Sequence, residues 1–319
     1  MTRSSIAPIP PGALDLTGEA VRRRRALQRS AMALLEDAGF AEAIPPTFEY
    51  AAIFLRAGGE EISDRLFRFT DLDGRTLALR YDFTAALARV AATSFADIPP
   101  PIRLCYTGKV YRQESGQGGR PREILQVGAE SMGEAGLASD VALVRLALAL
   151  LEALEITDYQ LNLGHVGVLS AGFAALPAEL HSEVRRWIDR KDRAALDREL
   201  SGLDSPAREL ASLPFVIGRG EALSQALTDA PPEVRPGLEQ LLALDQQLTD
   251  AERAHVVYDL GEVRGLDYYT GIHFELFATG ARRAVGAGGR YDDLMGRFGR
   301  AMPALGVTFD LDALAEIPS

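Results

Sequence analysis

The chain has 319 residues, of which 47% are hydrophobic and 25% are charged, the composition of an ordinary folded protein. No uncharged apolar run approaches the ~18–20 residues that cross a bilayer, and the N-terminus lacks the basic start and apolar core of a secretory signal. Cys105 is the only cysteine, which excludes an internal disulfide or a cluster of thiolate metal ligands. We therefore expect a cytoplasmic protein that does not associate with membranes.

The charge balance narrows the class of partner. The chain carries 34 basic and 45 acidic side chains, a net charge of −11, whereas binding to a phosphate backbone needs a basic footprint. The one dense basic run, four consecutive arginines at residues 22–25, would spread around every face of a helix and form no stripe. We interpret this run as a solvated helix start, and we expect no nucleic-acid ligand.

The N-terminal elements are a helix and a hairpin. Apolar residues at helical spacing predict a helix over residues 18–38, which Gly39 can end. Residues 66–69 and 76–79 are strand-like and flank Asp-Leu-Asp-Gly at residues 71–74, which has the chemistry of a turn.

A second, longer strand pair follows. Residues 102–113 and 124–132 are both strand-like, and a Gly-rich segment at residues 116–121 joins them. Ser139 is expected to cap a helix that continues to about residue 151. That helix is apolar nearly all round, which predicts that it is buried.

The next stretch, residues 166–250, is rich in Leu, Ala, Glu and Arg at helical spacing, and we interpret it as an inserted helical subdomain. Strands are expected again over residues 255–260, 272–279 and 305–309. Strand pairs joined by tight loops favour an α+β fold with an antiparallel sheet over a doubly wound parallel sheet. We therefore expect one core built from residues 1–165 and 251–319.

Several cofactor and metal templates are absent. There is no Gly-x-x-x-x-Gly-Lys-Ser/Thr nucleotide loop, and the Gly-rich segment 286–289 lacks the third glycine of a dinucleotide fingerprint. The four histidines show no zinc-type pairing, and each is interpreted as a surface or strand histidine; they are His165, His181, His255 and His273. We expect no cofactor and no metal.

Two clusters of polar residues are denser. Alternate residues of a strand share a face, so Arg112 points with Glu114, and Gln126 points with Glu130. If these strands pair antiparallel, the four side chains converge. The second cluster is Arg-Gly-Leu-Asp-Tyr-Tyr-Thr-Gly at residues 264–271. Arginine can bind a carboxylate bidentately, and tyrosines can flank a ring, so the set suits a zwitterion. Structural ion pairs on an exposed sheet face explain these residues equally well.

These strings resemble those of histidyl-tRNA synthetases and, more widely, the class II aminoacyl-tRNA synthetase core. Residues 264–271 are similar to the histidine-specific signature, and Gly-Gly-Arg-Tyr-Asp at residues 288–292 to its companion. Residues 111–130 resemble class II motif 2. Leu-Arg-Tyr-Asp-Phe-Thr at residues 79–84 resembles the family's Leu-Arg-Pro-Glu-Gly-Thr segment. The similarity runs from about residue 10 to about residue 314.

The resemblance implies a class II synthetase-like antiparallel sheet of six or seven strands, flanked by helices, that binds free L-histidine. It also implies a homodimer built around motif 1, near residues 45–55. Carried over by position, Asp82, Thr84 and Gln126 would hold the α-amino group of histidine. Arg112 and Arg264 would face its carboxylate.

The remaining positions address the side chain of the ligand. By the same resemblance, Glu130, Tyr269 and Tyr291 would contact the imidazole, and Tyr268 would line the same pocket.

The departures from the synthetase pattern concern ATP and tRNA. Ala313 stands where the motif 3 arginine is expected, with Asp310 and Asp312 beside it, and neutral or anionic groups should oppose a triphosphate. The chain ends at Ser319, so we expect no C-terminal anticodon-binding domain and no tRNA partner. We expect no catalytic residue.

The segment at residues 79–84 departs as well. Asp82 replaces the synthetase's glutamate, and Tyr81 and Phe83 replace its proline and glycine. An aspartate in this segment is typical of a catalytically silent branch that resembles truncated synthetases, the regulatory subunits of ATP phosphoribosyltransferase.

The resemblance to that branch implies a partner and a role. The partner is a short-form catalytic subunit, in a hetero-octamer that catalyses the first step of histidine biosynthesis under feedback by histidine. The complex is a phosphoribosyltransferase of the glycosyltransferase class. Two alternatives stay open: a truncated class II ligase that activates histidine or another acid for a non-tRNA acceptor, and a free-standing histidine sensor.

Overall fold

The computed structural model describes residues 9–114, 121–174, 176–203, 210–228, 230–261 and 268–318. The strands are β1 Ala41–Glu42, β2 Phe48–Tyr50, β3 Arg68–Thr70, β4 Thr76–Leu79, β5 Ile102–Tyr111, β6 Glu123–Met132, β7 Tyr159–His165, β8 Ile217–Gly218, β9 Val256–Asp259, β10 Ile272–Ala278, β11 Gly286–Arg290 and β12 Ala304–Asp310. The helices are α1 Gly18–Asp37, α2 Ala51–Gly58, α3 Thr84–Ala92, α4 Leu137–Ala153, α5 Val166–Ala174, α6 His181–Asp189, α7 Arg193–Glu199, α9 Gly220–Thr228, α10 Arg235–Gln247, α11 Asp250–Arg253, α12 Leu294–Arg297 and α13 Leu311–Glu316. Short 3₁₀ turns cover Glu60–Arg65, Ala178–Leu180, Leu200–Gly202 and Leu213–Phe215.

The main sheet is mostly antiparallel, as the sequence predicts. Its order in the described residues is β1-β5-β6-β12-β11-β10-β7-β9-β8, and the six central strands from β5 to β7 pair antiparallel throughout. The outer pairs β1–β5 and β7–β9 are parallel. The sheet of the described residues therefore has nine strands, more than the six or seven expected, and only its six central strands are antiparallel throughout. A separate sheet of order β2-β4-β3 contains the predicted hairpin.

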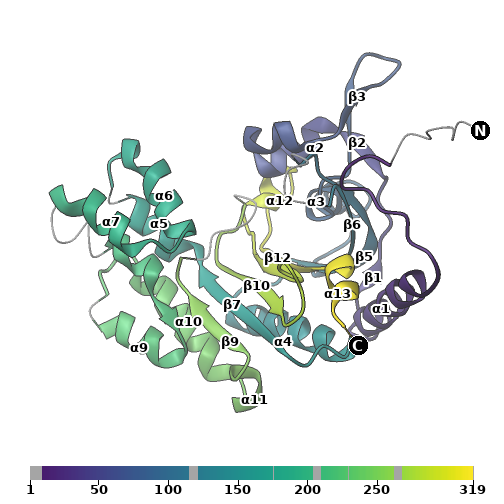
Figure 1. Cartoon of the computed structure of the whole chain (residues 1–319). Helices are drawn as coiled ribbons and strands as arrows, with labels where there is room; N and C mark the ends of the chain where they lie inside the picture. The colour runs from purple at the N-terminus through teal and green to yellow at the C-terminus, as the bar shows by residue number, and fades with distance from the viewer. Residues whose placement is uncertain are drawn as a thin grey trace, which may run out of the picture.

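Helices cover both faces of the main sheet (Figure 1). On one face, α1, α4, α10 and α13 pack over an apolar cluster that includes Val127, Val307 and Phe309. On the other face, α2, α3 and α12 contribute to a second cluster, which includes Tyr106 and Tyr291. Of the predicted site residues, Tyr268, Tyr269 and Tyr291 belong to this second cluster or pack against it.

The start of α4 differs from the prediction. The helix begins at Leu137 after Gly136, so Ser139 lies in the first turn and does not cap the helix. The φ of Gly136 is 82°, a value that glycine adopts easily, and this allows the chain to enter the helix earlier than expected. As predicted, the helix is largely buried.

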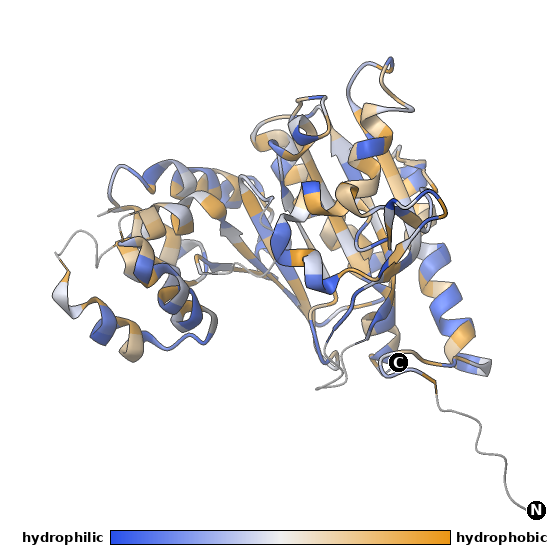
Figure 2. Ribbon diagram, turned by 90° about the horizontal axis from the view of Figure 1, so that it is seen from above, coloured by the Kyte–Doolittle hydropathy of each residue, from blue (hydrophilic) through white to orange (hydrophobic). Residues whose placement is uncertain are grey.

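The segment at residues 166–250 is helical over most of its described length, and β8 adds an edge strand to the main sheet. Its first part, α5 to α7, has its own small apolar core around Leu169, Val184 and Leu196. This part lies to one side of the sheet in both views (Figures 1 and 2). By contrast, α10 packs against α4 and β7, and Leu241 belongs to the main core.

Two arginines of the basic run hold the C-terminal helix in place. Arg24 pairs with Asp312 on α13, and Arg23 donates to the carbonyl of Ile317. The interpretation of the whole run as solvated is therefore wrong for these two residues. No described helix is both long and apolar enough to cross a bilayer.

Candidate functional site

Glu130 lies at the centre of the candidate site, on the face of the sheet opposite the main apolar core. Alternation along β6 places Gln126, Gly128 and Glu130 on one face. The antiparallel register sets Gly306 of β12 beside Glu130 and Gly289 of β11 beside Gly306. The antiparallel pairing of β5 and β6 that the sequence analysis requires for convergence is present, and Gln126 and Glu130 share a face as predicted.

The carboxylate of Glu130 is held by two hydroxyl groups from distant parts of the chain. Thr84 Oγ1, in the first residue of α3, donates to Glu130 Oε1 at 2.7 Å, and Tyr291 OH donates to Oε2. Glu130 is 1% exposed. Burial raises the pKa of Glu130 to about 8, although both hydroxyl donors act to lower it.

The three predicted tyrosines come together beside this carboxylate. The ring of Tyr268 makes edge contacts with the rings of Tyr269 and Tyr291, at centroid distances of 5.1 Å and 5.5 Å. Tyr268 and Tyr291 are buried. Aromatic edges and faces around one buried acceptor form an environment suited to a planar ring that carries an N–H donor.

Two glycines leave room for these side chains. A Cβ on Gly306 would overlap the carboxylate of Glu130, and a Cβ on Gly289 would lie 2.7 Å from the ring of Tyr269. Side chains at these strand positions would fill the pocket from its floor. The Gly-rich segment 286–289 thus serves as a strand that approaches the site closely.

Asp82 lies in the same buried region, just before α3. Its Oδ1 accepts from the backbone N–H of Ala85 at 2.8 Å. Burial raises its pKa, while this hydrogen bond and the charge of Arg112 lower it. Asp82 and Glu130 are therefore two buried carboxyl groups close enough for the charge of Asp82 to affect Glu130, a disposition suited to a ligand with positive charge or several N–H donors.

Arg112 and Gln126 line a cavity of about 810 Å³ on the same sheet face. The guanidinium of Arg112 lies over the ring of Tyr81 at 5.1 Å. Glu114 lies beyond the end of β5, but it also lines the cavity, and it pairs with Arg65 at 2.5 Å. Gln126 and Glu130 are four strand residues apart, about 13 Å, which accommodates a small amino acid with a hydrogen bond at each end.

Ala313, at the motif 3 position, does not line this cavity and belongs to the main apolar core on the opposite face of the sheet. Ala313 is fully buried in α13. Asp310 lines the cavity, caps α13 through the N–H groups of Asp312 and Ala313, and pairs with Arg283 at 2.9 Å. The carboxylate of Asp312 pairs with Arg24 on α1 and does not line this cavity, whereas that of Asp310 does.

Of the nine predicted site residues, the structure describes eight; Arg264 lies outside the described residues. Two residues of the site face were missed. Tyr106 on β5 faces Gly128 and is 1% exposed, and His273 on β10 stacks with Tyr269 at 6.2 Å. Alternation along β5 could have identified Tyr106, once Gln126 had fixed the face.

The histidines are partly as predicted. His165 and His273 are indeed strand residues, but both are buried. Among the described residues, no group of three histidine, cysteine or carboxylate side chains is placed to hold a metal ion.

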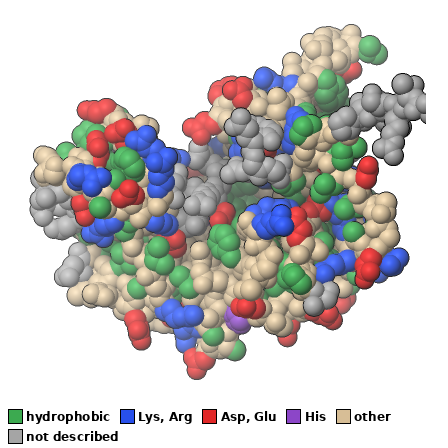
Figure 3. All heavy atoms as spheres, viewed as in Figure 1, with side chains coloured by type: hydrophobic (Ala, Val, Ile, Leu, Met, Phe, Trp, Pro, Cys, Tyr) green, Lys and Arg blue, Asp and Glu red, His purple; other side chains and the backbone are tan. Residues whose placement is uncertain are grey.

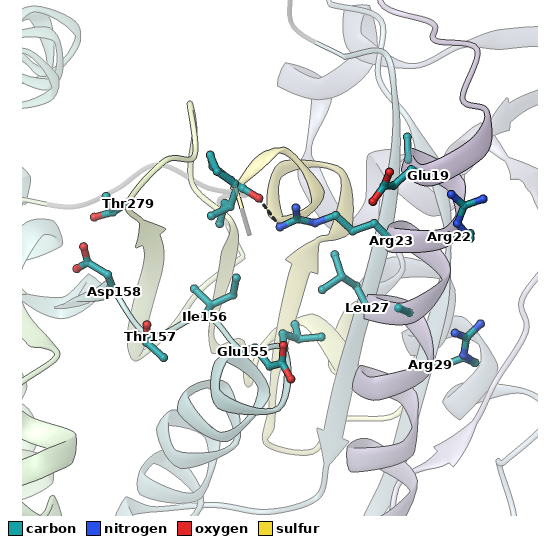
Figure 4. A pocket seen from close by; sticks show the side chains of 15 residues that line it. Glu19, Arg22, Arg23, Leu27, Arg29, Glu155, Ile156, Thr157, Asp158 and Thr279 are labelled. Carbon is teal, nitrogen blue, oxygen red and sulfur yellow. Dashed lines mark hydrogen bonds between the residues drawn. The ribbon is translucent and has the colours of Figure 1, made fainter.

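Another cavity, of about 970 Å³, lies elsewhere, between α1 and the C-terminal segment. It contains none of the described site residues, and its lining mixes Arg22 and Arg29 with Glu155 and Asp158. Figure 4 shows Arg23 reaching across it from α1. The face of the molecule seen in Figure 3 likewise carries interspersed basic and acidic side chains, as the lining of this cavity does.

The strand order and the site define a class of protein, the class II aminoacyl-tRNA synthetase-like fold. A sequence profile described as Histidyl-tRNA synthetase matches residues 12–314. An ATP phosphoribosyltransferase regulatory subunit of Geobacter sulfurreducens is 36% identical over 97% of this chain and 72% of its own length. The chain belongs to the histidyl-tRNA synthetase family.

Within that family, the chain resembles the relatives that carry the regulatory-subunit name. Another such relative, from Thiobacillus denitrificans, is 35% identical over 96% of both chains. A crystal structure described as an ATP phosphoribosyltransferase regulatory subunit/histidyl-tRNA synthetase from Bacillus halodurans has a TM-score of 0.89 and 26% identity, covering 99% of this chain and 84% of that one. A Histidine–tRNA ligase of Methanococcus vannielii is 33% identical over 96% of this chain and 74% of its own length.

Proposed function

We propose that this protein is a non-catalytic regulatory subunit of ATP phosphoribosyltransferase, a transferase of the glycosyltransferase class. It acts with a short-form catalytic subunit in the first step of histidine biosynthesis and reports the level of free L-histidine to that subunit. The observation that carries the proposal is the buried carboxylate of Glu130, held by Thr84 and Tyr291, in a protein with alanine at the motif 3 position.

The pocket has the chemistry to recognise histidine. Glu130 supplies a buried acceptor for an imidazole N–H, and the rings of Tyr268 and Tyr269 border the space for a planar side chain. We propose that Gln126 binds the α-amino group of the histidine ligand and that Arg112 binds its carboxylate; both residues line the cavity on this face of the sheet. Asp82 and Thr84 complete the proposed amino-group site, and Arg264 is proposed as a second carboxylate ligand.

The cavity wall argues against triphosphate chemistry. Arg65 pairs with Glu114, and Arg283 pairs with Asp310 and with Glu316 at 3.3 Å. A triphosphate would have to break these pairs and approach their carboxylates, which costs free energy through desolvation and like-charge repulsion. With Ala313 buried, no cation replaces the motif 3 arginine at its own position.

The assembly that we propose is a homodimer within a hetero-octamer. Ile44, Phe48 and Tyr50, in the motif 1 region, are 83%, 53% and 39% exposed, which supports an interface there between two copies of the chain. We further propose that residues 166–250 form an inserted subdomain between the two parts of the core, residues 1–165 and 251–319. Regulation requires that histidine favour one state of the complex, with a coupling free energy of about 1–3 kcal/mol.

Reconstitution tests the proposal. The protein is mixed with a short-form phosphoribosyltransferase from the same organism, and phosphoribosyl-ATP formation is recorded while histidine is titrated. We expect a large complex whose activity responds to histidine. If neither a complex nor a response is seen, the regulatory role is refuted.

The runner-up is a truncated ligase that activates histidine or another acid. It is supported by the arginine at position 112 in the cavity wall and by the similarity to a Histidine–tRNA ligase. Histidine-dependent exchange of pyrophosphate into ATP distinguishes the two functions, because the regulatory subunit should show none. A free-standing histidine sensor would bind histidine but form no complex with a phosphoribosyltransferase.

A further inference from the structure

Behind the site, a continuous series of hydrogen-bonded polar side chains, buried except for the half-buried Gln240, joins the candidate pocket to the helical segment. It starts at Arg290, which is 5% exposed and precedes Tyr291. Its guanidinium donates to Asp140 Oδ1 on α4 at 2.8 Å from Nε, with Nη2 2.7 Å from the same oxygen. Asp140 is fully buried, and its Oδ2 accepts from Gln240 Nε2 on α10 at 2.7 Å.

This series of hydrogen bonds ends at His165, where β7 meets α5. His165 Nε2 lies 3.1 Å from Gln240 Oε1, and its Nδ1 accepts from the backbone N–H of Gly167 at 3.0 Å. Because Nδ1 is an acceptor, the hydrogen of a neutral ring is on Nε2 and donates to Gln240. Burial also lowers the pKa of His165, in agreement with a neutral ring. The hydrogen bonds therefore run in one direction, from His165 through Gln240 to Asp140.

At the other end of the series, Arg290 holds two segments that border the pocket, the one after Tyr269 and the one around Tyr291. The backbone carbonyl of Arg290 accepts from Thr270 N–H at 2.8 Å, which holds the segment after Tyr269. Arg290 Nη1 donates to Asp292 Oδ1 at 3.0 Å, and Asp292 N–H in turn donates to Thr270 Oγ1 at 2.9 Å. Tyr291, the donor to Glu130, lies between these two anchored residues.

The helical segment is attached at the same place. The N–H of Val166, the first residue of α5, donates to the carbonyl of Gly271 at 3.0 Å. Arg290 packs on Gly271, since a Cβ there would lie 3.1 Å from its Cδ. A shift of α10 relative to α4 would break the Gln240 bonds and leave Asp140 with an unpaired buried lone pair, which is costly.

We infer that Arg290 and Asp140 are positioning residues of the pocket, and that Gln240 and His165 extend them into a link through which ligand occupancy and the placement of α5 and α10 affect each other. This inference rests on the proposed function, because it takes L-histidine as the ligand. It assigns α5 and α10 as the elements that respond when the pocket is filled.

The direction of the hydrogen bonds gives a specific variant. In Asp140→Asn, the side-chain oxygen can still accept from Arg290, but the amide then donates toward Gln240. Gln240 must turn over and present its NH₂ to His165 Nε2, which already carries a hydrogen. The NH₂ group of Gln240 then faces the N–H of His165, and two donors cannot form a hydrogen bond. Replacing one oxygen of Asp140 by nitrogen therefore breaks the link between Asp140 and His165.

Gln240→Met is the milder variant, because Gln240 is only half-buried and methionine matches its length. Gln246→Met, on the exposed face of the same helix, is its control. L-histidine affinity is measured by calorimetry, and amide hydrogen exchange is followed with and without histidine. A merely structural role of Gln240 would not remove a ligand-dependent change in exchange.

We expect histidine to slow exchange at the start of α5 and in α10 of the wild-type protein and of Gln246→Met. In Gln240→Met and Asp140→Asn, this slowing should be lost and the affinity should fall three- to tenfold or more. If Gln240→Met keeps both the affinity and the slowing, or if wild-type α5 and α10 do not respond to bound histidine, the inference is overturned while the proposed function stands. If the wild-type protein does not bind histidine at all, both fall together.

Discussion

Thr84 Oγ1 donates a hydrogen bond of 2.7 Å to Glu130 Oε1 and so connects the first residue of α3 to β6. The two residues are 46 positions apart in sequence. Through this contact, the segment at residues 79–84 and motif 2 act on one buried carboxylate. The two features that the resemblance treats as separate signatures are thus parts of a single pocket.

The first prediction concerns Glu130. Glu130→Ala should abolish histidine binding or weaken it strongly, because the buried acceptor for the imidazole is lost, while the fold persists. Calorimetry of histidine binding measures the loss, and circular dichroism checks the fold. Glu152→Ala, which removes an exposed carboxylate on α4, is the control and should bind normally. An unchanged affinity in Glu130→Ala would remove Glu130 from the pocket.

The second prediction concerns pH. The pKa of Glu130 is about 8 in the folded protein, above its usual value of 4.5, so between these values the folded state holds a proton that the unfolded state has released. The free energy of unfolding must therefore fall as pH rises through this window. In Glu130→Gln this contribution is absent.

The measurement is denaturant unfolding of both ligand-free proteins between pH 5 and pH 8.5. Relative to Glu130→Gln, the wild-type protein should lose stability steadily across this range, by up to about 1.4 kcal/mol for each pH unit. Asp82, whose pKa is also raised, is present in both proteins and largely cancels in the difference. Parallel pH profiles would contradict the prediction.

The sequence predicted more of the candidate site residues than of the contacts that hold them in place, such as the bond between Arg290 and Asp140. Strand alternation predicted that Gln126 and Glu130 share a face, and they do, because neighbours within one strand fix which face a side chain takes. The three tyrosines that the resemblance singled out lie together beside Glu130. The bond between Arg290 and Asp140 spans 150 residues. It depends on how α4 packs against the end of β11, which no local pattern encodes.

The same limit explains the other errors. The pattern of residues 18–38 gives a helix, but only tertiary packing turns Arg24 toward Asp312 on α13. Likewise, β8 has two residues, too few to produce an alternating signal. For α4, a serine three residues from the true cap was a reasonable candidate, and the positive φ of Gly136 decided the start.

The third prediction concerns Ala313. Ala313→Arg should not create adenylation activity, and it should destabilise the protein by at least about 1–3 kcal/mol, because a long charged side chain would enter a buried position. Asp310, which lines the cavity and caps α13, remains in place. Pyrophosphate exchange and thermal unfolding are the two measurements. Measurable exchange would show that a single residue separates this protein from its enzyme relatives.

The fourth prediction concerns Lys191, which has a φ of 53° in the turn between α6 and α7. Its ammonium pairs with Asp259 at 2.7 Å, and the Asp259 side chain is only 5% exposed. This contact ties the small helical core to the end of β9. Two separate effects therefore meet at one residue: a backbone conformation that favours glycine, and an ion pair that requires a long cation.

Substitutions at Lys191 separate these effects. Lys191→Ala keeps the strained backbone and loses the ion pair, so it should be the least stable variant. Lys191→Gly also loses the pair but relieves the strain, and should be more stable than Lys191→Ala by up to about 1 kcal/mol. Glu155→Gly is the matched control, since Glu155 has a φ of 59°, is exposed and lies two residues after the end of α4, so only the backbone effect applies there. Urea unfolding of all three proteins gives the comparison. If Lys191→Gly has the same free energy of unfolding as the wild-type protein, the ion pair to Asp259 adds only as much stability as the backbone strain at Lys191 takes away.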